Sequence, residues 1–275
     1  MDKAEDYFNT FRDYDFPYPE YNLDYLVKQF DKLKSIDCSE LKNRNDCLPI
    51  IYQFHKSIWS CNKKGYLSPY DGWYDDTILL KCIDNRLKYK GKTLTLDNIR
   101  DGLTIAQLAP KVSIFRPYVA KYIINKYLSD FDTIFDPCAG FSGRMLGAAS
   151  LNKSYIGQDI NATTICESLL LKTFLHLPNV TLSVKNSVCD NGEYECLFTC
   201  PPYGDKENWG EVSDILSADE WIDICLNNYK CKRYVFVVDK SEKYQKYIKE
   251  KLSNKSHFSN NTECIICIDR NDIKY

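Results

Sequence analysis

From about residue 111 onward, short apolar runs alternate with longer segments in which apolar residues recur at helical spacing. The longer segments are RPYVAKYIINKYL, GRMLGAASL, NATTICESLLLKTFL, ADEWIDICLNNYK and EKYQKYIKEKL. The apolar runs predict strands, in the order TIFD, SYIGQD, VTLSV, YECLFT, RYVFVVD and TECIICID. Ser217 and Glu220 have the spacing of a capping box at the start of the fourth helix. Strands that alternate with helices predict a parallel, doubly wound α/β sheet of Rossmann type.

The first part of the chain lacks this alternation. Residues 1 to about 110 are rich in Tyr, Asp, Asn and Lys. The segment NLDYLVKQFDKLKSI carries apolar residues at helical spacing, namely Leu23, Leu26, Phe30 and Leu33. We therefore predict a mainly helical N-terminal extension over residues 1–110, followed by the sheet domain over residues 111–275.

Composition excludes several classes of protein. Hydrophobic residues make up 44% of the 275 residues, and no run approaches the roughly 18 apolar residues of a membrane span. The opening MDKAEDYFNTFRDYDF is acidic and aromatic, unlike a secretory or transit signal, so we predict an intracellular protein with no membrane partner. The 13 cysteines are then expected to be reduced thiols.

No metal site is predicted. The C-x-x-C formed by Cys264 and Cys267 lies inside a predicted strand, and His55, His176 and His257 stand far apart in the sequence. A zinc site usually needs about four ligands in paired short spacings.

The charge balance bears on nucleic-acid binding. A net charge of −2 counts against a nonspecific, high-affinity nucleic-acid binder, since that affinity comes mostly from neutralising phosphates. Two local basic stretches remain, NRLKYKGKT and YKCKRY. Each could contact nucleic acid or could be a solvated turn or helix end.

Ligands of doubly wound sheets sit at the carboxyl ends of the strands, so the motifs there matter most. After the first strand comes FDPCAGFSGR, in which Gly140 and Gly143 would let the backbone approach a ligand. The spacing matches neither a dinucleotide fingerprint nor a P-loop. A purely structural turn would also explain these glycines.

The next two strand ends carry polar residues. Asp159, in GQDIN, lies sixteen residues after Gly143, where a ribose hydroxyl pair is bound in nucleoside-binding sheets. It could also be the N-cap of the helix that follows. In VKNSVCD, either Asn186 or Asp190 could meet the edge of an adenine, or be a loop residue.

The fourth strand ends in LFTCPPYGD, where two prolines fix the direction of the chain. In this order and spacing, FDPCAGFSGR, YIGQD and TCPPY resemble the S-adenosylmethionine-dependent DNA methyltransferases that modify exocyclic amino groups, adenine N6 or cytosine N4. Asp136, Pro137 and Gly140 match their cofactor motif Asp-Pro-x-x-Gly-x-Gly, with Ser142 in the expected small position and Gly143 directly after it. Pro201, Pro202 and Tyr203 match three of the four places of their catalytic motif. The resemblance covers roughly residues 113–270.

The resemblance implies a Rossmann-like class I methyltransferase sheet, S-adenosyl-L-methionine as cofactor, and DNA, with a base flipped into the pocket, as partner. The segment IFRPYVAKYI resembles the one that flanks the methionine end of the cofactor. The expected cofactor-binding residues are Phe115, Pro117, Asp136, Pro137, Cys138, Ala139, Gly140, Gly143, Asp159, Ile160, Asn186 and Asp190. The expected catalytic turn is Cys200, Pro201, Pro202 and Tyr203.

Cys200 departs from the family pattern, because the family has Asp, Asn or Ser at this place. A thiol is a weak hydrogen-bond acceptor, and Ser, its nearest relative in shape, is more typical of the cytosine-N4 members. Two alternatives stay open. Cys200 could be a nucleophile, as in cytosine-C5 methylation, although those enzymes place a proline directly before the cysteine. It could also mark an inactive relative that only binds the cofactor.

The acceptor is the second open question. The extension before residue 110 is the expected DNA-reading part, because the sheet domain leaves no room for a separate recognition domain between its motifs. Its aromatic stretch GYLSPYDGWYDD could stack on bases or belong to a core. RNA, a protein glutamine or a small amine are alternative acceptors, and the sequence gives no prediction of the oligomeric state.

Overall fold

The structure is a computed structural model that describes residues 3–42, 44–90, 93–201, 207–208, 216–239, 257–259 and 263–272. Its contacts group the chain into two compact units. The helical unit comprises Met1–Tyr21, His55–Ser113 and Asp205–Val212, and the sheet unit comprises Asn22–Phe54, Ile114–Gly204 and Ser213–Tyr275. The domain boundary expected near residue 110 stays a prediction. The contacts within the structure place Asn22–Phe54 in the sheet unit.

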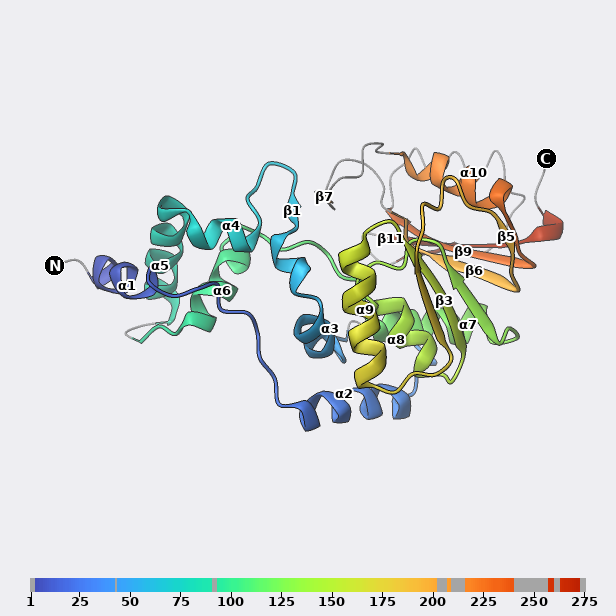
Figure 1. The fold of residues 1–275 in the computed structure, drawn as a ribbon, viewed down its shortest axis with the longest axis horizontal. Coiled ribbons are helices and arrows are strands. Elements are labelled where there is room, and N and C mark those ends of the chain that lie inside the picture. Colours follow the sequence, from blue (N-terminus) through green and yellow to red (C-terminus); the bar gives the residue numbers. More distant parts are fainter. Residues whose placement is uncertain are drawn as a thin grey trace. The chain divides into compact units, whose positions relative to one another are not determined.

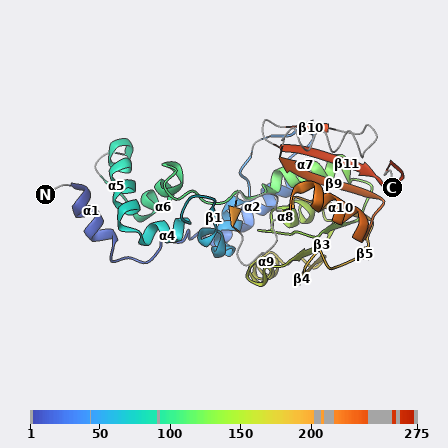
Figure 2. The same cartoon turned by 90° about the horizontal axis from the view of Figure 1, so that it is seen from above.

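The sheet unit is built on seven strands in the order β4-β3-β2-β6-β9-β11-β10 (Figures 1 and 2). Their bounds are β2 Thr133–Asp136, β3 Ser154–Asp159, β4 Val180–Val184, β6 Cys196–Thr199, β9 Arg233–Asp239, β10 His257–Ser259 and β11 Glu263–Asp269. Strands β4, β3, β2, β6 and β9 are parallel, whereas β11 runs antiparallel to β9 and β10. This order confirms the predicted doubly wound, Rossmann-like α/β fold.

The strand order reverses at β2. From β2 the chain continues to β3 and β4 on one side, then returns to place β6 and β9 on the other. The carboxyl ends of β2 and β6 therefore lie side by side at the point where ligands bind in doubly wound sheets. Six of the seven strands match the runs read from the sequence, and the short β10 was not predicted.

Helices α7 Pro117–Tyr127, α8 Gly143–Ala149, α9 Ala162–Phe174 and α10 Ala218–Asn228 accompany the strands in the predicted order. Helix α2 Leu23–Ser35 was also predicted, whereas α3 Leu48–Phe54 was not. The unit also has a 3₁₀ turn at Arg270–Asp272 and a short parallel pair of strands, β5 Gly192–Glu193 and β8 Tyr229–Lys230. The capping box of Ser217 and Glu220 is formed at the start of α10. The predicted helix EKYQKYIKEKL lies outside the described residues.

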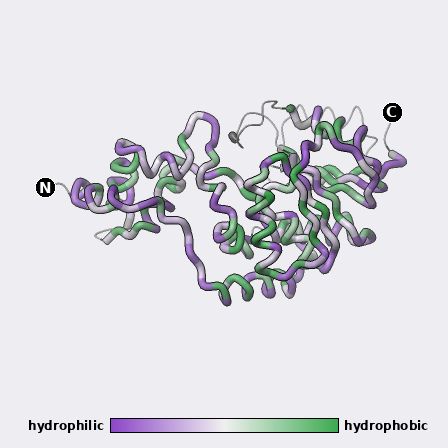
Figure 3. Tube along the Cα trace, in the orientation of Figure 1, coloured by the Kyte–Doolittle hydropathy of each residue, from purple (hydrophilic) through white to green (hydrophobic). Residues whose placement is uncertain are grey.

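Apolar side chains of the strands fill the core of the sheet unit. Strand β6 is buried along its whole length, and its Leu197 packs with Phe135, Phe236 and Ile266 in one cluster. Figure 3 shows the strands as largely hydrophobic. Helix α8 packs on α7 and β3, and α9 packs on β3, β4 and α3.

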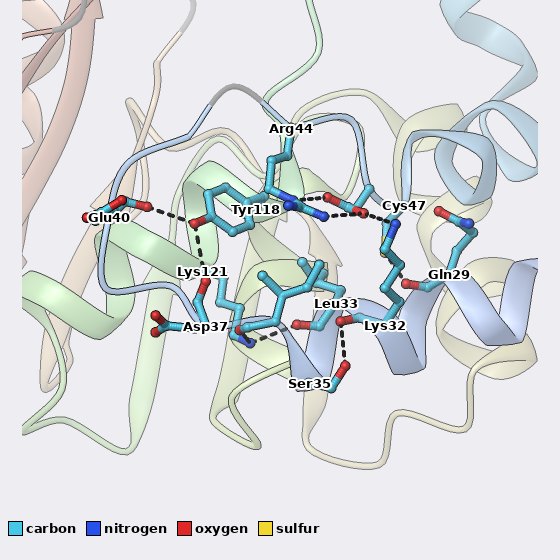
Figure 4. A network of polar contacts seen from close by, with 12 residues as sticks. Gln29, Lys32, Leu33, Ser35, Asp37, Glu40, Arg44, Cys47, Tyr118 and Lys121 are labelled. Carbon is cyan, nitrogen blue, oxygen red and sulfur yellow. Dashed lines mark hydrogen bonds and ion pairs between the residues drawn. The ribbon is translucent and has the colours of Figure 1, made fainter.

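Helix α2 joins this unit through two side chains of α7 (Figure 4). The buried Lys121 donates from Nζ to the carbonyl oxygens of Leu33, Lys34 and Ile36 at 2.7, 2.9 and 2.7 Å, and so satisfies the carboxyl end of α2. The hydroxyl of Tyr118 donates to the carbonyl of Glu40 at 2.7 Å. Burial lowers the pKa of Lys121.

The apolar face predicted for α2 is confirmed for three of its four residues. Leu26, Phe30 and Leu33 are buried. Leu23, the first residue of the helix, is 55% exposed.

The helical unit is small and rich in aromatic residues. Its elements are α1 Lys3–Phe11, a 3₁₀ turn at Lys56–Ser60, β1 Asn62–Lys63, α4 Pro69–Tyr74, α5 Asp76–Lys90, α6 Leu96–Ile105 and β7 Glu207–Asn208, which pairs with β1. Phe16 packs against Trp59 and Trp73 at its centre, and the Trp73 indole donates to the carbonyl of Tyr14 at 3.0 Å.

Candidate cofactor and catalytic site

The carboxyl end of β2 is organised by a fully buried carboxylate, Asp136. Its Oδ2 accepts from Arg144 Nε and from the Tyr155 hydroxyl, each at 2.6 Å. Its Oδ1 accepts from the Thr199 hydroxyl at 2.8 Å and from the Cys138 N–H at 3.2 Å. Asp136 is therefore surrounded by protein donors from α8, β3, β6 and its own turn.

Arg144 is 3% exposed and links this carboxylate to the turn that follows β2. Besides its ion pair with Asp136, its Nη2 donates to the carbonyl of Cys138, and the guanidinium lies 5.0 Å from the centre of the Phe115 ring. Burial opposes the charge of Arg144, but Asp136 outweighs it and raises the arginine's pKa further. This role was not predicted, since the only available signal was an arginine next to the glycine turn.

The structure explains the two glycines of FDPCAGFSGR in two different ways. Gly140 adopts a left-handed backbone, with φ of +56°. A Cβ on Gly143 would lie 1.8 Å from the carbonyl oxygen of Phe115, so only glycine allows this close approach. Ser142 is also left-handed, with φ of 62°, and its hydroxyl lies 2.8 Å from that of Ser168 on α9.

Phe115 and Pro117 lie where the chain enters α7. Pro117 is the first residue of α7 and is buried, whereas Phe115 is partly exposed. The Phe115 ring meets Phe198 of β6 edge-on, with ring centres 5.8 Å apart. Phe115 thus contacts both the glycine turn and the strand that leads to the predicted catalytic turn.

Asp159 ends β3 beside the glycine turn. Its Oδ2 accepts from the Gly140 N–H at 2.9 Å and its Oδ1 from the Asn161 N–H at 3.0 Å. The N-cap of α9 is Asn161, not Asp159, so the alternative role for Asp159 is wrong. Burial raises the pKa of Asp159, although the two N–H donors act in the opposite direction. Ile160, the next residue, is 46% exposed.

The loop after β4 carries the other two polar candidates. Asp190 accepts from Gln158 Nε2 at 2.8 Å and pairs with Lys185 at 3.3 Å. Although burial opposes the shift, these bonds lower the pKa of Asp190. The exposed Asn186 uses its side-chain oxygen for the N–H of Val188 at 3.0 Å. Asp190 is thus tied to β3, while Asn186 is tied to its own turn.

Gln158 is a residue that the sequence reasoning missed. It is 2% exposed, and its carbonyl accepts from the Ala139 N–H at 2.7 Å. Its side-chain Oε1 has no hydrogen-bond partner among the described residues. Its position directly before Asp159 was the available signal.

The remaining turn residues, Pro137, Cys138 and Ala139, are held by backbone contacts. The hydroxyl of Ser187 donates to the carbonyl of Pro137. Burial raises the pKa of the Cys138 thiol well above its ordinary value. Cys138 is therefore a neutral thiol near neutral pH.

The predicted catalytic turn begins where β6 ends. Thr199, the last residue of β6, is fully buried and bonded to Asp136; Cys200 follows as a partly exposed thiol, and Pro201 is buried. Pro202 and Tyr203 lie outside the described residues. The structure thus brings the start of the catalytic turn and the glycine turn to adjacent strand ends.

One arginine of each basic stretch is buried or paired within the protein. Arg86 of NRLKYKGKT is buried, and Arg233 of YKCKRY pairs with Asp269 at 2.6 Å. None of the twelve cysteines whose side chains are described is in a disulfide. Within the described ranges, no cluster of His, Cys, Asp or Glu could hold a metal ion, and no helix is long and apolar enough to cross a membrane.

No protein-family model matches the chain, and no curated protein matches its sequence. Among solved structures, a Listeria monocytogenes protein assigned as a class I S-adenosylmethionine-dependent methyltransferase is 13% identical, with 90% of this chain and 88% of that chain covered and a TM-score of 0.44. TrmK of M. capricolum, in complex with S-adenosylhomocysteine, is 15% identical, with 58% and 70% covered and a TM-score of 0.42. An rRNA methylase of Streptococcus thermophilus is 14% identical, with 57% and 98% covered and a TM-score of 0.39. The fold assignment rests on the strand order described above.

Proposed function

We propose that the chain is an S-adenosylmethionine-dependent methyltransferase that methylates an exocyclic amino group of a DNA base, adenine N6 or cytosine N4. The observation that carries the proposal is the adjacency of two motifs. The Asp-Pro-x-x-Gly-x-x-Gly turn after β2 and the Cys-Pro-Pro-Tyr turn after β6 follow neighbouring parallel strands at the switch point of the sheet. A donor bound at the first turn would lie beside an acceptor held at the second.

The residues at the strand ends fit the proposed cofactor. Gly143 keeps the start of α8 free of a side chain, and Gly140 adopts the left-handed backbone that glycine favours. Each oxygen of Asp159 accepts one N–H and keeps capacity for a second donor, as a ribose hydroxyl pair requires. The buried Gln158 Oε1 is an acceptor without a partner among the described residues, next to the predicted adenine side. These features support Asp159 and the glycine turn as cofactor contacts.

The acceptor chemistry explains the catalytic turn. S-adenosylmethionine, when bound, supplies a methyl group on a sulfonium. An exocyclic amine is a poor nucleophile, because its lone pair is delocalised into the ring. A backbone carbonyl of the Pro-Pro segment would accept an amine hydrogen and localise that lone pair, since proline restricts the backbone around it. Tyr203 would stack on a base rotated out of the duplex.

Cys200 would take the place of the second acceptor. Its thiol accepts weakly, so placement by the backbone carbonyl would carry most of the effect. Thr199 before it is bonded to Asp136, which fixes the start of the turn. We assign Cys200 a contact role and no covalent step.

An exposed turn of the helical unit suits contact with a nucleic-acid acceptor. It spans Lys64 to Leu67 directly after β1, with Gly65 at φ of +82°, and the Asn62 side-chain amide donates to the Tyr66 carbonyl at 3.1 Å. Lys64 is exposed at this turn and Tyr66 is 45% exposed, whereas Trp73 of the same aromatic stretch is buried. A lysine beside an exposed ring suits phosphate and base contacts.

The test is a transfer assay with methyl-labelled S-adenosylmethionine. Unmethylated genomic DNA, total RNA and a mixture of proteins are offered separately, and labelled DNA is digested to nucleosides. The proposal expects label in DNA, as N6-methyladenine or N4-methylcytosine. Label confined to RNA or protein would contradict the acceptor, and 5-methylcytosine would contradict the mechanism. Binding of the cofactor without transfer to any acceptor would identify a binding-only protein.

A further inference from the structure

The carboxylate of Asp136 has partners on both halves of the proposed site. One of its oxygens takes the hydroxyl of Thr199, the residue directly before the catalytic turn, and the other takes Nε of Arg144, which also holds the glycine turn through the carbonyl of Cys138. A single rigid side chain is thus bonded to groups that precede the catalytic turn and surround the cofactor turn.

We propose that Asp136 is an anchor that sets the distance between the two turns, with Thr199 as a positioning residue for the catalytic turn and Arg144 as a positioning residue for the cofactor turn. The proposal rests on the proposed function. It gives Asp136 no ligand contact of its own, since the carboxylate is fully buried and accepts hydrogen bonds from four residues of the described protein, Cys138, Arg144, Tyr155 and Thr199.

On the side of the catalytic turn, Asp136 contacts Thr199 directly. Thr199 is fully buried, and its hydroxyl bond to Asp136 is 2.8 Å long. Strand β6 makes its last pairing with β2 at Leu197 and Phe135, so beyond that point this side-chain bond holds the end of β6 to the end of β2. Cys200 and the prolines follow at once, and a change in the direction of Thr199 would move the acceptor groups.

The geometry on the cofactor side runs through Arg144. Its planar fork contacts Asp136 and the Cys138 carbonyl while its face lies over Phe115. A lysine would keep the charge but could not keep all three contacts, because it lacks the planar fork. Arg144 therefore orients both the glycine turn and the aromatic ring that borders the site.

The anchor predicts a crossed pattern of kinetic effects. Thr199→Val keeps the shape of the side chain but removes its hydroxyl, so kcat falls about tenfold to a hundredfold while the dissociation constant for S-adenosylhomocysteine stays within about twofold. Thr199→Ser keeps the hydroxyl and restores most of kcat. Arg144→Lys weakens S-adenosylhomocysteine binding about tenfold and changes kcat little at saturating cofactor.

Tyr155→Phe is the matched control. It removes a hydrogen bond from the same carboxylate, but Tyr155 reaches Asp136 from β3. A general loss of stability would affect Thr199→Val and Tyr155→Phe alike, whereas the anchor predicts a fall in kcat for Thr199→Val only. Binding of S-adenosylhomocysteine by calorimetry shows that each variant is folded.

The experiment measures kcat with DNA and the S-adenosylhomocysteine dissociation constant for the wild type and these variants. The crossed pattern, with rescue by Thr199→Ser, is the expected result. Equal kcat in Thr199→Val and Tyr155→Phe, or no rescue by serine, overturns the anchor and leaves the proposed function standing. A wild-type protein that binds no cofactor and transfers no methyl group overturns both.

Discussion

The contact between Gly143 and Phe115 is the tightest feature of the proposed cofactor site, and Gly143→Ala tests it. An added Cβ would lie 1.8 Å from the Phe115 carbonyl oxygen and 2.8 Å from its carbonyl carbon. Both are backbone atoms, so no side-chain rotation relieves the clash. The start of α8 and the Phe115 segment must separate by roughly 1.2 Å to reach even a 3.0 Å contact.

The size of the effect follows from this displacement. Overpacking that forces backbone shifts costs about 1–3 kcal/mol, and a clash with backbone belongs at the upper end. Gly143 is the first residue of α8, so alanine regains less than the roughly 1 kcal/mol of helix propensity that it gains in a helix interior. We expect Gly143→Ala to lose about 2 kcal/mol of unfolding free energy, and to weaken S-adenosylhomocysteine binding about tenfold or more because Phe115 is displaced.

Two measurements give these numbers: urea unfolding followed by circular dichroism, and calorimetric titration with S-adenosylhomocysteine. Gly147→Ala is the matched control on the same helix. Its Cβ would lie 2.5 Å from Ala120 Cβ, so it also overpacks α7 against α8, but one turn away from Phe115. We expect it to lose stability and to bind cofactor within about twofold of the wild type. Wild-type stability and affinity in Gly143→Ala would refute the reasoning.

Three further predictions concern charge and the catalytic turn. Asp159→Asn should weaken S-adenosylhomocysteine binding about tenfold to a hundredfold in calorimetry, because charged hydrogen bonds are lost. Burial raises the pKa of Asp159 in the folded state, so above this pKa the Asp159 carboxylate charge destabilises the folded protein. The melting temperature of Asp159→Asn should therefore not fall. Cys200→Ser should keep or raise methyl transfer, and complete loss in a folded variant would indicate a nucleophilic thiol instead. Burial lowers the pKa of Lys111 to about 8, so the wild-type free energy of unfolding should rise with pH between about 8 and 10.5. Lys111→Met should lack that rise. If the free energy of unfolding depends on pH equally in both proteins, Lys111 does not have the lowered pKa.

The fold was readable from the sequence because the signals were local. Thr133–Asp136, Ser154–Asp159 and Val180–Val184 are short segments with apolar residues bounded by turn residues, and the structure has strands at these predicted positions. Their order in the sheet follows from the strand–helix alternation. The three-residue β10 was too short to give a pattern.

The packing of Asn22–Phe54 depends on long-range contacts that no local sequence pattern predicts. The helix α2 itself was predicted, but its attachment depends on Lys121, a lysine within the predicted helix α7, whose Nζ meets three carbonyls about 85 residues earlier in the chain. Lysines are mostly exposed, so a buried lysine at a helix end is seen only once the fold is known.

The candidate site was predicted in part for the same reason. The approach of Asp159 to the glycine turn follows from adjacent parallel strands, and the Gly140–Asp159 bond matches that expectation. The partners of Asp136 could not be predicted, because Tyr155 and Thr199 come from two other strands and meet the carboxylate through register and side-chain direction. The sequence motif identified Asp136 as a site residue, but only the arrangement of the sheet shows that its carboxylate bonds to other groups of the protein.

The central claim is that the strand ends of β2, β3 and β6 form a site for S-adenosylmethionine. Calorimetric titration of the wild-type protein with S-adenosylhomocysteine, beside Asp159→Asn, tests it most directly. We predict one binding site per chain in the wild type and a clearly weaker one in the variant. No binding by the wild type, or equal binding by both proteins, would contradict the claim.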